Sequence, residues 1–95
     1  MSVAPLTLNL TLKWRGMNPI EKLQAAFVET LNVSPASPFD ELAYGVTEGW
    51  DSVAHMSLIS SLEEKFDVML PTEDVIDMSS YPKAQEILRK HGVSF

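Results

Sequence analysis

The feature that most limits the fold is the helical spacing of apolar residues in three separate segments of the chain. Ile20, Leu23 and Phe27 recur at intervals of three and four residues, which places them on one face of a helix. Residues 51–66 and 80–91 repeat this kind of pattern. Because a chain of 95 residues has room for one small core, the sequence predicts an all-α fold in which these apolar faces pack together.

Capping residues predict where the first helix begins and ends. Asn18 is a suitable N-cap, because Pro19 fits the first helical position and Glu21 completes a capping box. The helix is expected to end near Asn32. Residues 33–50 then contain several prolines and glycines, which predicts a long loop.

The second segment has the strongest helical pattern in the chain. Asp51 is a suitable N-cap, and the helix is expected to end before Asp67 or Val68, since Pro71 excludes much continuation. The face expected to be buried consists of Val53, Met56, Leu58, Ile59, Leu62 and Phe66.

Two further helices complete the predicted architecture. A short one is expected over residues 72–78, and a last one from about Ser80 to His91, with Gly92 as its C-terminal cap. The sequence therefore predicts a small four-helix bundle, with three longer helices, a short third helix and a long loop between the first two. The predicted core consists of Leu23, Phe27, Leu31, Ile59, Leu62, Phe66, Ile76, Ile87 and Leu88.

The first 16 residues differ in pattern from the rest of the chain. Between Leu6 and Leu12, leucines alternate with polar residues in the period of two that is typical of a strand, and no second strand is predicted to pair with them. Two interpretations of residues 1–16 stay open. They form a disordered or edge-pairing leader, or they precede the true start, with translation beginning at Met17. The folded domain is expected to span residues 17–95.

The charge of the chain limits the partners that it is expected to bind. Thirteen acidic residues against seven basic ones give a net charge of −6. Without Lys13 and Arg15 of the leader, five basic residues remain against the same 13 acids, a net charge of −8. Such a charge disfavours nucleic acid and anionic lipid, and favours a basic protein partner. With neither a signal peptide nor a membrane-spanning run recognised, we expect a soluble, cytoplasmic monomer.

Residue types limit the chemistry that the chain itself can perform. It has no cysteine, so a disulfide, a thiolate metal ligand and a cysteine nucleophile are all excluded. Asp51, Ser52 and His55 have the residue types of a catalytic triad, but adjacent Asp and Ser side chains point in different directions and no oxyanion hole is indicated. His55 and His91 lie far apart in sequence, so no metal site is expected. Ser52 either helps to begin a helix or, at the positive end of that helix, carries a phosphate.

A longer segment favours the second interpretation of Ser52. In GWDSVAHMSLISSLEEKFDV, Gly49 to Val68, a glycine is followed by Asp-Ser, an aliphatic residue and an amphipathic helix that ends in Leu-Glu-Glu-x-Phe. This segment resembles the phosphopantetheine attachment segment of the acyl carrier protein family. The resemblance covers about Met17 to Gly92 and implies a four-helix bundle of acyl-carrier type. It also implies that the protein is a carrier and not an enzyme.

The resemblance further implies a covalent cofactor and a set of partner enzymes. A phosphopantetheinyl transferase, using Mg²⁺ and coenzyme A, would attach 4′-phosphopantetheine to Ser52, and the thiol of this arm would hold an acyl group as a thioester. Asp51 would present the serine and cap the helix. Val53, where the family usually has Leu, would take part in recognition by the transferase. The other implied partners are acyl- or aminoacyl-activating ligases, synthases and acyltransferases.

In the family, the helix that begins at the modified serine is the main docking surface for partner enzymes. Two positions that are often acidic in carriers of the main fatty-acid pathway are Ala54 and Ser57 here. This difference indicates a dedicated lipid, polyketide or surface-modification pathway. Two alternatives stay open, an aminoacyl or peptidyl carrier and an unmodified carrier-like binding module. The implied docking residues are Ala54, His55, Met56, Ser57, Glu63 and Glu64.

Overall fold

The computed structural model describes residues 17–95, which are mostly helical. This part of the chain forms a small all-α bundle, as predicted, and its only β-structure is a single bridge between Ala43 and Ser80. None of its helices is long and apolar enough to cross a membrane. The predicted leader, residues 1–16, lies outside the described residues. In chain order the elements are α2 (Pro19–Leu31), the 3₁₀ turn η1 (Phe39–Glu41), α3 (Ser52–Phe66), α4 (Thr72–Asp77) and α5 (Tyr81–Lys90).

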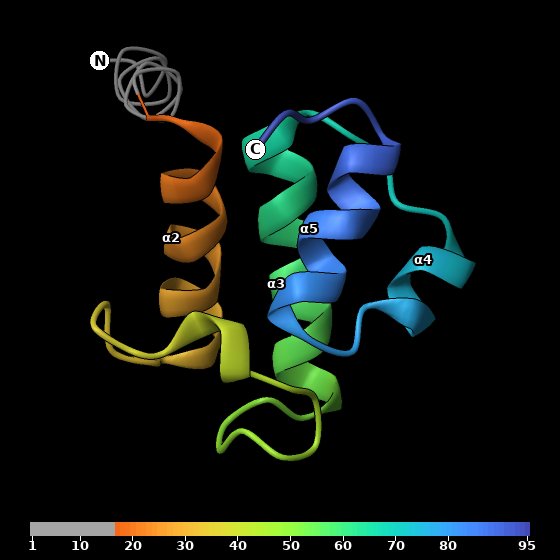
Figure 1. Cartoon of the computed structure of the whole chain (residues 1–95). Coiled ribbons are helices and arrows are strands. Elements are labelled where there is room, and N and C mark those ends of the chain that lie inside the picture. Colours follow the sequence, from red (N-terminus) through yellow and green to blue (C-terminus); the bar gives the residue numbers. More distant parts are fainter. Residues whose placement is uncertain (1–16) are drawn as a thin grey trace, which may run out of the picture.

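The three longer helices lie side by side, and the short helix α4 lies at the edge of the bundle (Figure 1). Helix α2 runs antiparallel to α3, which in turn runs in the same general direction as α5. The loop between α2 and α3 crosses the lower end of the bundle in this view, where α3 begins. The C terminus lies at the opposite end.

The predicted limits of α2 are confirmed in detail. Asn18 and Glu21 form the capping box, with Oδ1 of Asn18 accepting from the Glu21 N–H at 2.8 Å and Oε1 of Glu21 accepting from the Asn18 N–H at 3.2 Å. At the other end, Asn32 takes a left-handed conformation with φ of 61°. This conformation ends the helix, because the chain cannot continue in a right-handed turn.

The core lies between α2, α3 and α5 and is closed by residues of the long loop. Phe27 is fully buried, and its ring makes edge contacts with Trp50 at 5.3 Å and with Tyr81 at 5.2 Å between centroids. Burial of each large apolar side chain stabilises the fold by about 1.5–3 kcal/mol. Phe66 is only partly buried. The predicted core residues that are buried are Leu23, Phe27, Leu31, Ile59, Leu62, Ile87 and Leu88.

The prediction that Val53 and Met56 belong to the buried face of α3 is wrong. Val53 is 77% exposed and Met56 is 56% exposed, whereas Leu58 and Leu62 are fully buried. Successive residues of an α-helix are about 100° apart, so Val53 points about 140° away from Leu58 and Met56 about 160° away. Once Leu58 packs against α2, the two earlier side chains face solvent.

The prediction that Ile76 belongs to the core is also wrong, since this side chain is 74% exposed. Helix α4 turns Asp74 inward, and Met78, directly after the helix, is also turned inward; each is only 1% exposed. A residue two positions from either of them points about 160° away from it around a helix. Ile76 therefore faces outward because of the pair that flanks it.

A charged side chain also lies within the buried face of α3. Lys65 is 5% exposed, and its ammonium group donates to Oε1 of Glu29 at 2.8 Å and to Oγ of Ser61 at 3.3 Å. Because Glu29 lies on α2, this ion pair joins the two antiparallel helices. The spacing of apolar residues alone did not predict this pair.

Candidate functional site at the start of helix α3

The loop that leads to Ser52 is held in place by the connection between α4 and α5. The backbone N–H of Tyr44 donates to the carbonyl of Ser79 at 2.9 Å, and the N–H of Tyr81 donates to the carbonyl of Leu42 at 3.1 Å. These bonds flank the bridge between Ala43 and Ser80. The loop is therefore long but anchored, and it approaches α3 from a fixed point.

Gly49 lies where this loop passes close to the end of α2. Its φ is +90°, and a Cβ atom at this residue would lie 2.9 Å from the carbonyl oxygen of Leu31. A side chain would therefore meet both backbone strain and a clash with a backbone atom. Glycine allows the chain to turn here and to deliver the next residue, Trp50, into the core.

Trp50 anchors the site from below, since its side chain is only 2% exposed. It packs edge-on against Phe27 of α2, and the ring of Tyr44 lies at 6.3 Å from it in a second edge contact. The backbone of the next two residues, Asp51 and Ser52, is thereby placed at the surface directly above the core.

Asp51 and Ser52 form the beginning of α3. Oδ1 of Asp51 accepts from the N–H of Ala54 at 2.9 Å, so Asp51 is the N-cap, as predicted. Ser52 is the first residue of the helix and is exposed. Its hydroxyl lies at the helix end where N–H groups and the dipole favour an anion. Chemically, this is an accessible hydroxyl in a field that stabilises a phosphate ester.

His55 connects three parts of the structure one helical turn beyond Ser52. The indole N–H of Trp50 donates to Nδ1 of His55 at 2.9 Å, and Nε2 lies 2.8 Å from the carbonyl oxygen of Val75. Because an indole nitrogen only donates, Nδ1 must accept and Nε2 must carry the proton that it shares with Val75. Both ring nitrogens of His55 are thus engaged, and neither is available to take a proton from Ser52.

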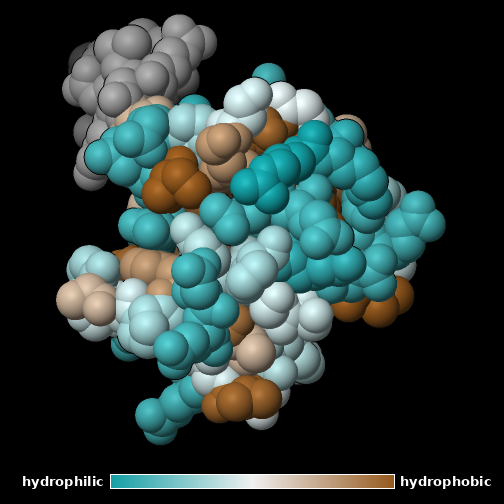
Figure 2. All heavy atoms as spheres, in the orientation of Figure 1, coloured by the Kyte–Doolittle hydropathy of each residue, from teal (hydrophilic) through white to brown (hydrophobic). Residues whose placement is uncertain are grey.

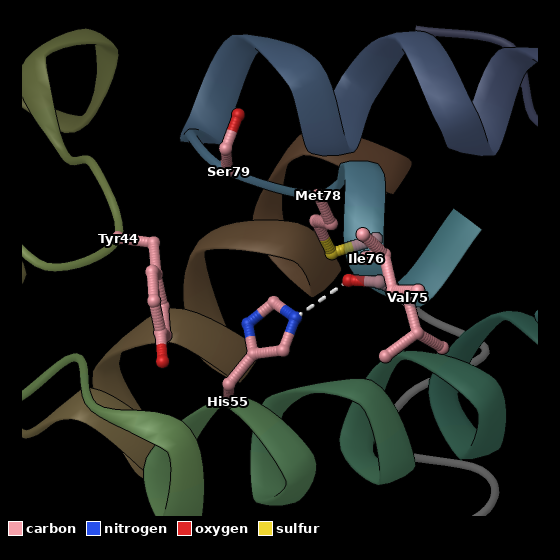
Figure 3. A pocket seen from close by; sticks show the side chains of 6 residues that line it. All are labelled: Tyr44, His55, Val75, Ile76, Met78 and Ser79. Atoms are coloured by element: carbon pink, nitrogen blue, oxygen red, sulfur yellow. Dashed lines mark hydrogen bonds between the residues drawn. The ribbon is translucent and has the colours of Figure 1, made fainter. Parts of the chain in front are cut away.

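A cavity of about 230 Å³ lies beside His55, between the start of α3 and helix α4. Figure 3 shows Tyr44 and His55 on one side of this space and the side chains of α4 on the other. The rings of Tyr44 and His55 meet edge to face, with centroids 5.3 Å apart and planes at 69°. The lining residues are Tyr44, His55, Val75, Ile76, Met78 and Ser79.

Helix α4 forms a wall of this cavity and is held by a buried carboxylate. Oδ2 of Asp74 accepts from Nε2 of His91 at 2.7 Å, and Oδ1 accepts from the ammonium group of Lys90. The hydrogen bond from His91, and then that from Lys90, lowers the pKa of Asp74 below its ordinary value. The same carboxylate raises the pKa of Lys90. The position of α4 is thus tied to the end of α5.

The residues expected to dock partner enzymes fall into two groups on α3. Near Ser52, the side chains of Val53, Met56 and Ser57 are exposed. Ala54 is half-buried and packs against the core. The exposed part of this helix start therefore carries apolar side chains and a hydroxyl, without an acid between Ser52 and Ser57.

The two predicted acids lie at the far end of α3. Glu63 is half-buried, and its Oε2 accepts from the N–H of Leu70 at 2.9 Å, which fixes the chain after the helix. Glu64 is exposed. Figure 2 shows hydrophobic side chains at several places on the viewed face, among them the lower end of the molecule and the right edge near α4.

The sequence placed His55 on the docking surface but did not indicate its role inside the site. The structure shows it half-buried and bonded at both nitrogens, with Tyr44 and Trp50 around it. The contribution of Tyr44, Val75 and Met78 to a cavity was also not predicted. The sequence signal for this arrangement was the pair of aromatic residues in the loop, Tyr44 and Trp50, ahead of a histidine in the first helical turn.

The site thus combines an exposed hydroxyl, a capped helix start and a neighbouring cavity. Among residues 17–95, no three His, Asp or Glu side chains are grouped so that they could hold a metal ion. No protein-family model matches the chain, and no solved structure matches it.

Proposed function

We propose that this protein is an acyl carrier that bears 4′-phosphopantetheine on Ser52. The observation that carries the proposal is the position of Ser52, which is exposed and begins the 15-residue helix α3 directly after the N-cap Asp51. The resemblance of residues 49–68 to a phosphopantetheine attachment segment supplies the identity of the group. The all-α bundle, with its long loop between α2 and α3 and its short α4, is compatible with an acyl-carrier fold.

The chain's own residues suit this group at Ser52. The first N–H groups of a helix have no partners within it, and only that of Ala54 is taken by Asp51. The remaining positive field supports a phosphodiester at the first residue, an effect of about 0.3–1 kcal/mol at an exposed site. When bound, the arm would supply the thiol that forms a thioester with the cargo. This role suits a chain that has no cysteine.

The surface near Ser52 supports a dedicated pathway for specialised lipid, polyketide or surface-modification chemistry. Val53 and Met56 are exposed. Between and beside them, Ala54 and Ser57 occupy the two positions that are often acidic in carriers of bulk fatty-acid synthesis. A partner would meet shape and apolar area at the helix start, while charge mainly tunes the encounter rate. The proposed partners are a phosphopantetheinyl transferase and a ligase, synthase or acyltransferase that loads the arm in the cytoplasm. We propose that the carrier itself is a monomer and not an enzyme.

Modification in vitro tests the proposal directly. The apo protein is incubated with coenzyme A, Mg²⁺ and a broad-specificity phosphopantetheinyl transferase, and its intact mass is measured. We expect a gain of one phosphopantetheine group, lost in Ser52→Ala and kept in the control Ser60→Ala, which changes another exposed serine on α3. No gain with several transferases would favour the unmodified binding module.

The class of cargo needs a second observation. Neighbouring genes that encode ketosynthases or acyl ligases support an acyl cargo. Genes for enzymes that adenylate amino acids would instead favour an aminoacyl or peptidyl carrier. The enzymes that those genes encode are then used to load the modified protein, and its intact mass distinguishes an acyl cargo from an aminoacyl or peptidyl cargo.

A further inference from the structure

The ring of His55 separates the cavity beside Ser52 from the core of the protein. On one side the ring lines the cavity, and on the other its edge is hydrogen-bonded to the edge of the Trp50 indole, with planes at 23° and centroids 6.0 Å apart. Trp50 is itself buried and contacts Phe27. A group that enters the cavity can therefore go no deeper unless the imidazole moves.

The imidazole is fixed by its two hydrogen bonds. Rotating it out of place would take away the acceptor of the Trp50 indole N–H, which lies against the core, and the donor to the Val75 carbonyl. A buried donor without a partner is costly, so the ring resists displacement. The opposite wall is also restrained, because Asp74 ties α4 to His91 and Lys90 of the α5 end.

The size of the cavity limits what it can hold. A cavity of ~150 Å³ holds one benzene ring. At the same packing, the cavity of about 230 Å³ has room for about nine non-hydrogen atoms. Val75, Ile76 and Met78 supply an apolar lining, and Tyr44 and Ser79 complete it. The space suits a compact apolar group.

We propose that His55 is a specificity-determining residue, which limits the cargo sheltered by this carrier to compact acyl groups, such as a medium-length chain of about eight carbons or a single aryl ring. The inference rests on the proposed function of Ser52. His55 lies three residues after Ser52 on α3, so the two share a helix face. The arm therefore begins one helical turn from the cavity, and the end of the cargo would reach it when the arm folds back.

A series of acyl groups on the arm tests this size limit. The apo protein is loaded by the transferase with acetyl-, butyryl-, hexanoyl-, octanoyl-, dodecanoyl- and phenylacetyl-coenzyme A, and the rate of thioester cleavage by hydroxylamine is followed by mass. Each methylene that enters the cavity should slow cleavage by roughly twofold to fourfold. We expect this protection to rise up to octanoyl, to stop rising at dodecanoyl, and to be present for phenylacetyl.

Variants of His55 show whether the imidazole sets the limit. In His55→Ala the protection should continue to rise to dodecanoyl. His55→Asn should give the same shift, because its side chain is shorter than that of His. Its side-chain oxygen can still accept from the Trp50 indole N–H, which protects the fold. Ser79→Phe, at an exposed lining position, should move the limit to shorter groups. The control Val28→Ala shortens a half-buried side chain on α2 that does not line this cavity and should keep the wild-type profile.

The outcomes separate this inference from the proposed function. If the wild-type protein gains no acyl-phosphopantetheine, the function proposed for Ser52 fails. If it is loaded but protection rises steadily to dodecanoyl, or both His55 variants keep the wild-type profile while folded by circular dichroism, only the role of His55 is overturned.

Discussion

The indole N–H of Trp50 donates to Nδ1 of His55 at 2.9 Å, and the planes of the two rings lie within 23° of each other. This contact joins the last loop residue before the Asp-Ser pair to the first turn of α3. Through its other nitrogen, His55 extends the link to the Val75 carbonyl on α4. The start of α3, the core and α4 are thus coupled by one side chain.

Removing the imidazole should therefore destabilise the fold through its partner. We expect His55→Ala to cost about 1–3 kcal/mol, because the buried indole N–H of Trp50 loses its acceptor. In a Trp50→Phe background the same change should cost less, since no donor is left unpaired. Urea denaturation followed by circular dichroism of the four proteins measures the coupling. If the costs of the two single variants add up to the cost of the double variant within ~0.5 kcal/mol, the hydrogen bond contributes little.

Two glycines of the long loop provide a matched comparison. Gly45 and Gly49 both have positive φ, at 77° and 90°, but only at Gly49 would a Cβ meet a backbone atom, the carbonyl oxygen of Leu31. We expect Gly45→Ala to cost about 1–2 kcal/mol from backbone strain. Gly49→Ala should cost clearly more, because the clash is added to the strain. Equal melting temperatures for the two variants would contradict this account of how the loop passes α2.

The buried carboxylate of Asp74 should make stability depend on acid pH. Hydrogen bonds from His91 and Lys90 lower its folded-state pKa. Its pairing therefore contributes stability that is fully present above the unfolded pKa of about 3.9 and is lost as the pH falls through the lower folded pKa. Asp74→Asn should be less stable than wild type at pH 7, and the gap should shrink at pH 3.

Urea midpoints at the two pH values measure this gap. The control Asp77→Asn removes an exposed carboxylate from the same helix. The difference in stability between this control and wild type should therefore be about the same at pH 7 and at pH 3. Because the other carboxylates titrate in all three proteins, the difference between the variants isolates Asp74. A gap for Asp74→Asn that is constant with pH would refute the assigned pairing.

The two roles of Asp51 can be separated by substitution. Asp51→Asn keeps a side-chain oxygen for the Ala54 N–H and should preserve stability, whereas Asp51→Ala should cost about 0.5–2 kcal/mol through loss of the cap. If the charge also presents Ser52 to a transferase, both variants should be modified more slowly than wild type. Modification rates from intact mass at matched temperatures test this. Full-speed modification of Asp51→Asn would restrict the role of Asp51 to capping.

Helix limits could be predicted from the sequence because they depend on neighbouring residues. The Asn18 and Glu21 box at the start of α2 and the N-cap at Asp51 are local patterns with one favourable geometry each. The side of a helix that becomes buried depends instead on what packs against it. Val53 and Ile76 are apolar, but their neighbours Leu58 and Asp74 were placed inward and turned them to solvent.

The candidate site divides in the same way. Ser52 and its cap Asp51 are adjacent in sequence, so their place at the start of a helix was predictable. The cavity is assembled from a loop residue, Tyr44, from α3 and from the 75–79 segment, and no local pattern reports that these segments meet. His55 was singled out as unusual, but its bond to Val75 requires α4 to return beside α3.

The bridge between Ala43 and Ser80 has a consequence for the order of assembly during synthesis. Helix α3 can form from local contacts, but the loop ahead of Ser52 is anchored only after the chain as far as Tyr81 has docked. On the ribosome, the segment that holds this anchor is made after the serine itself. An enzyme that recognises the finished loop, such as the proposed transferase, would therefore meet it only after the chain as far as Tyr81 has been made and has docked.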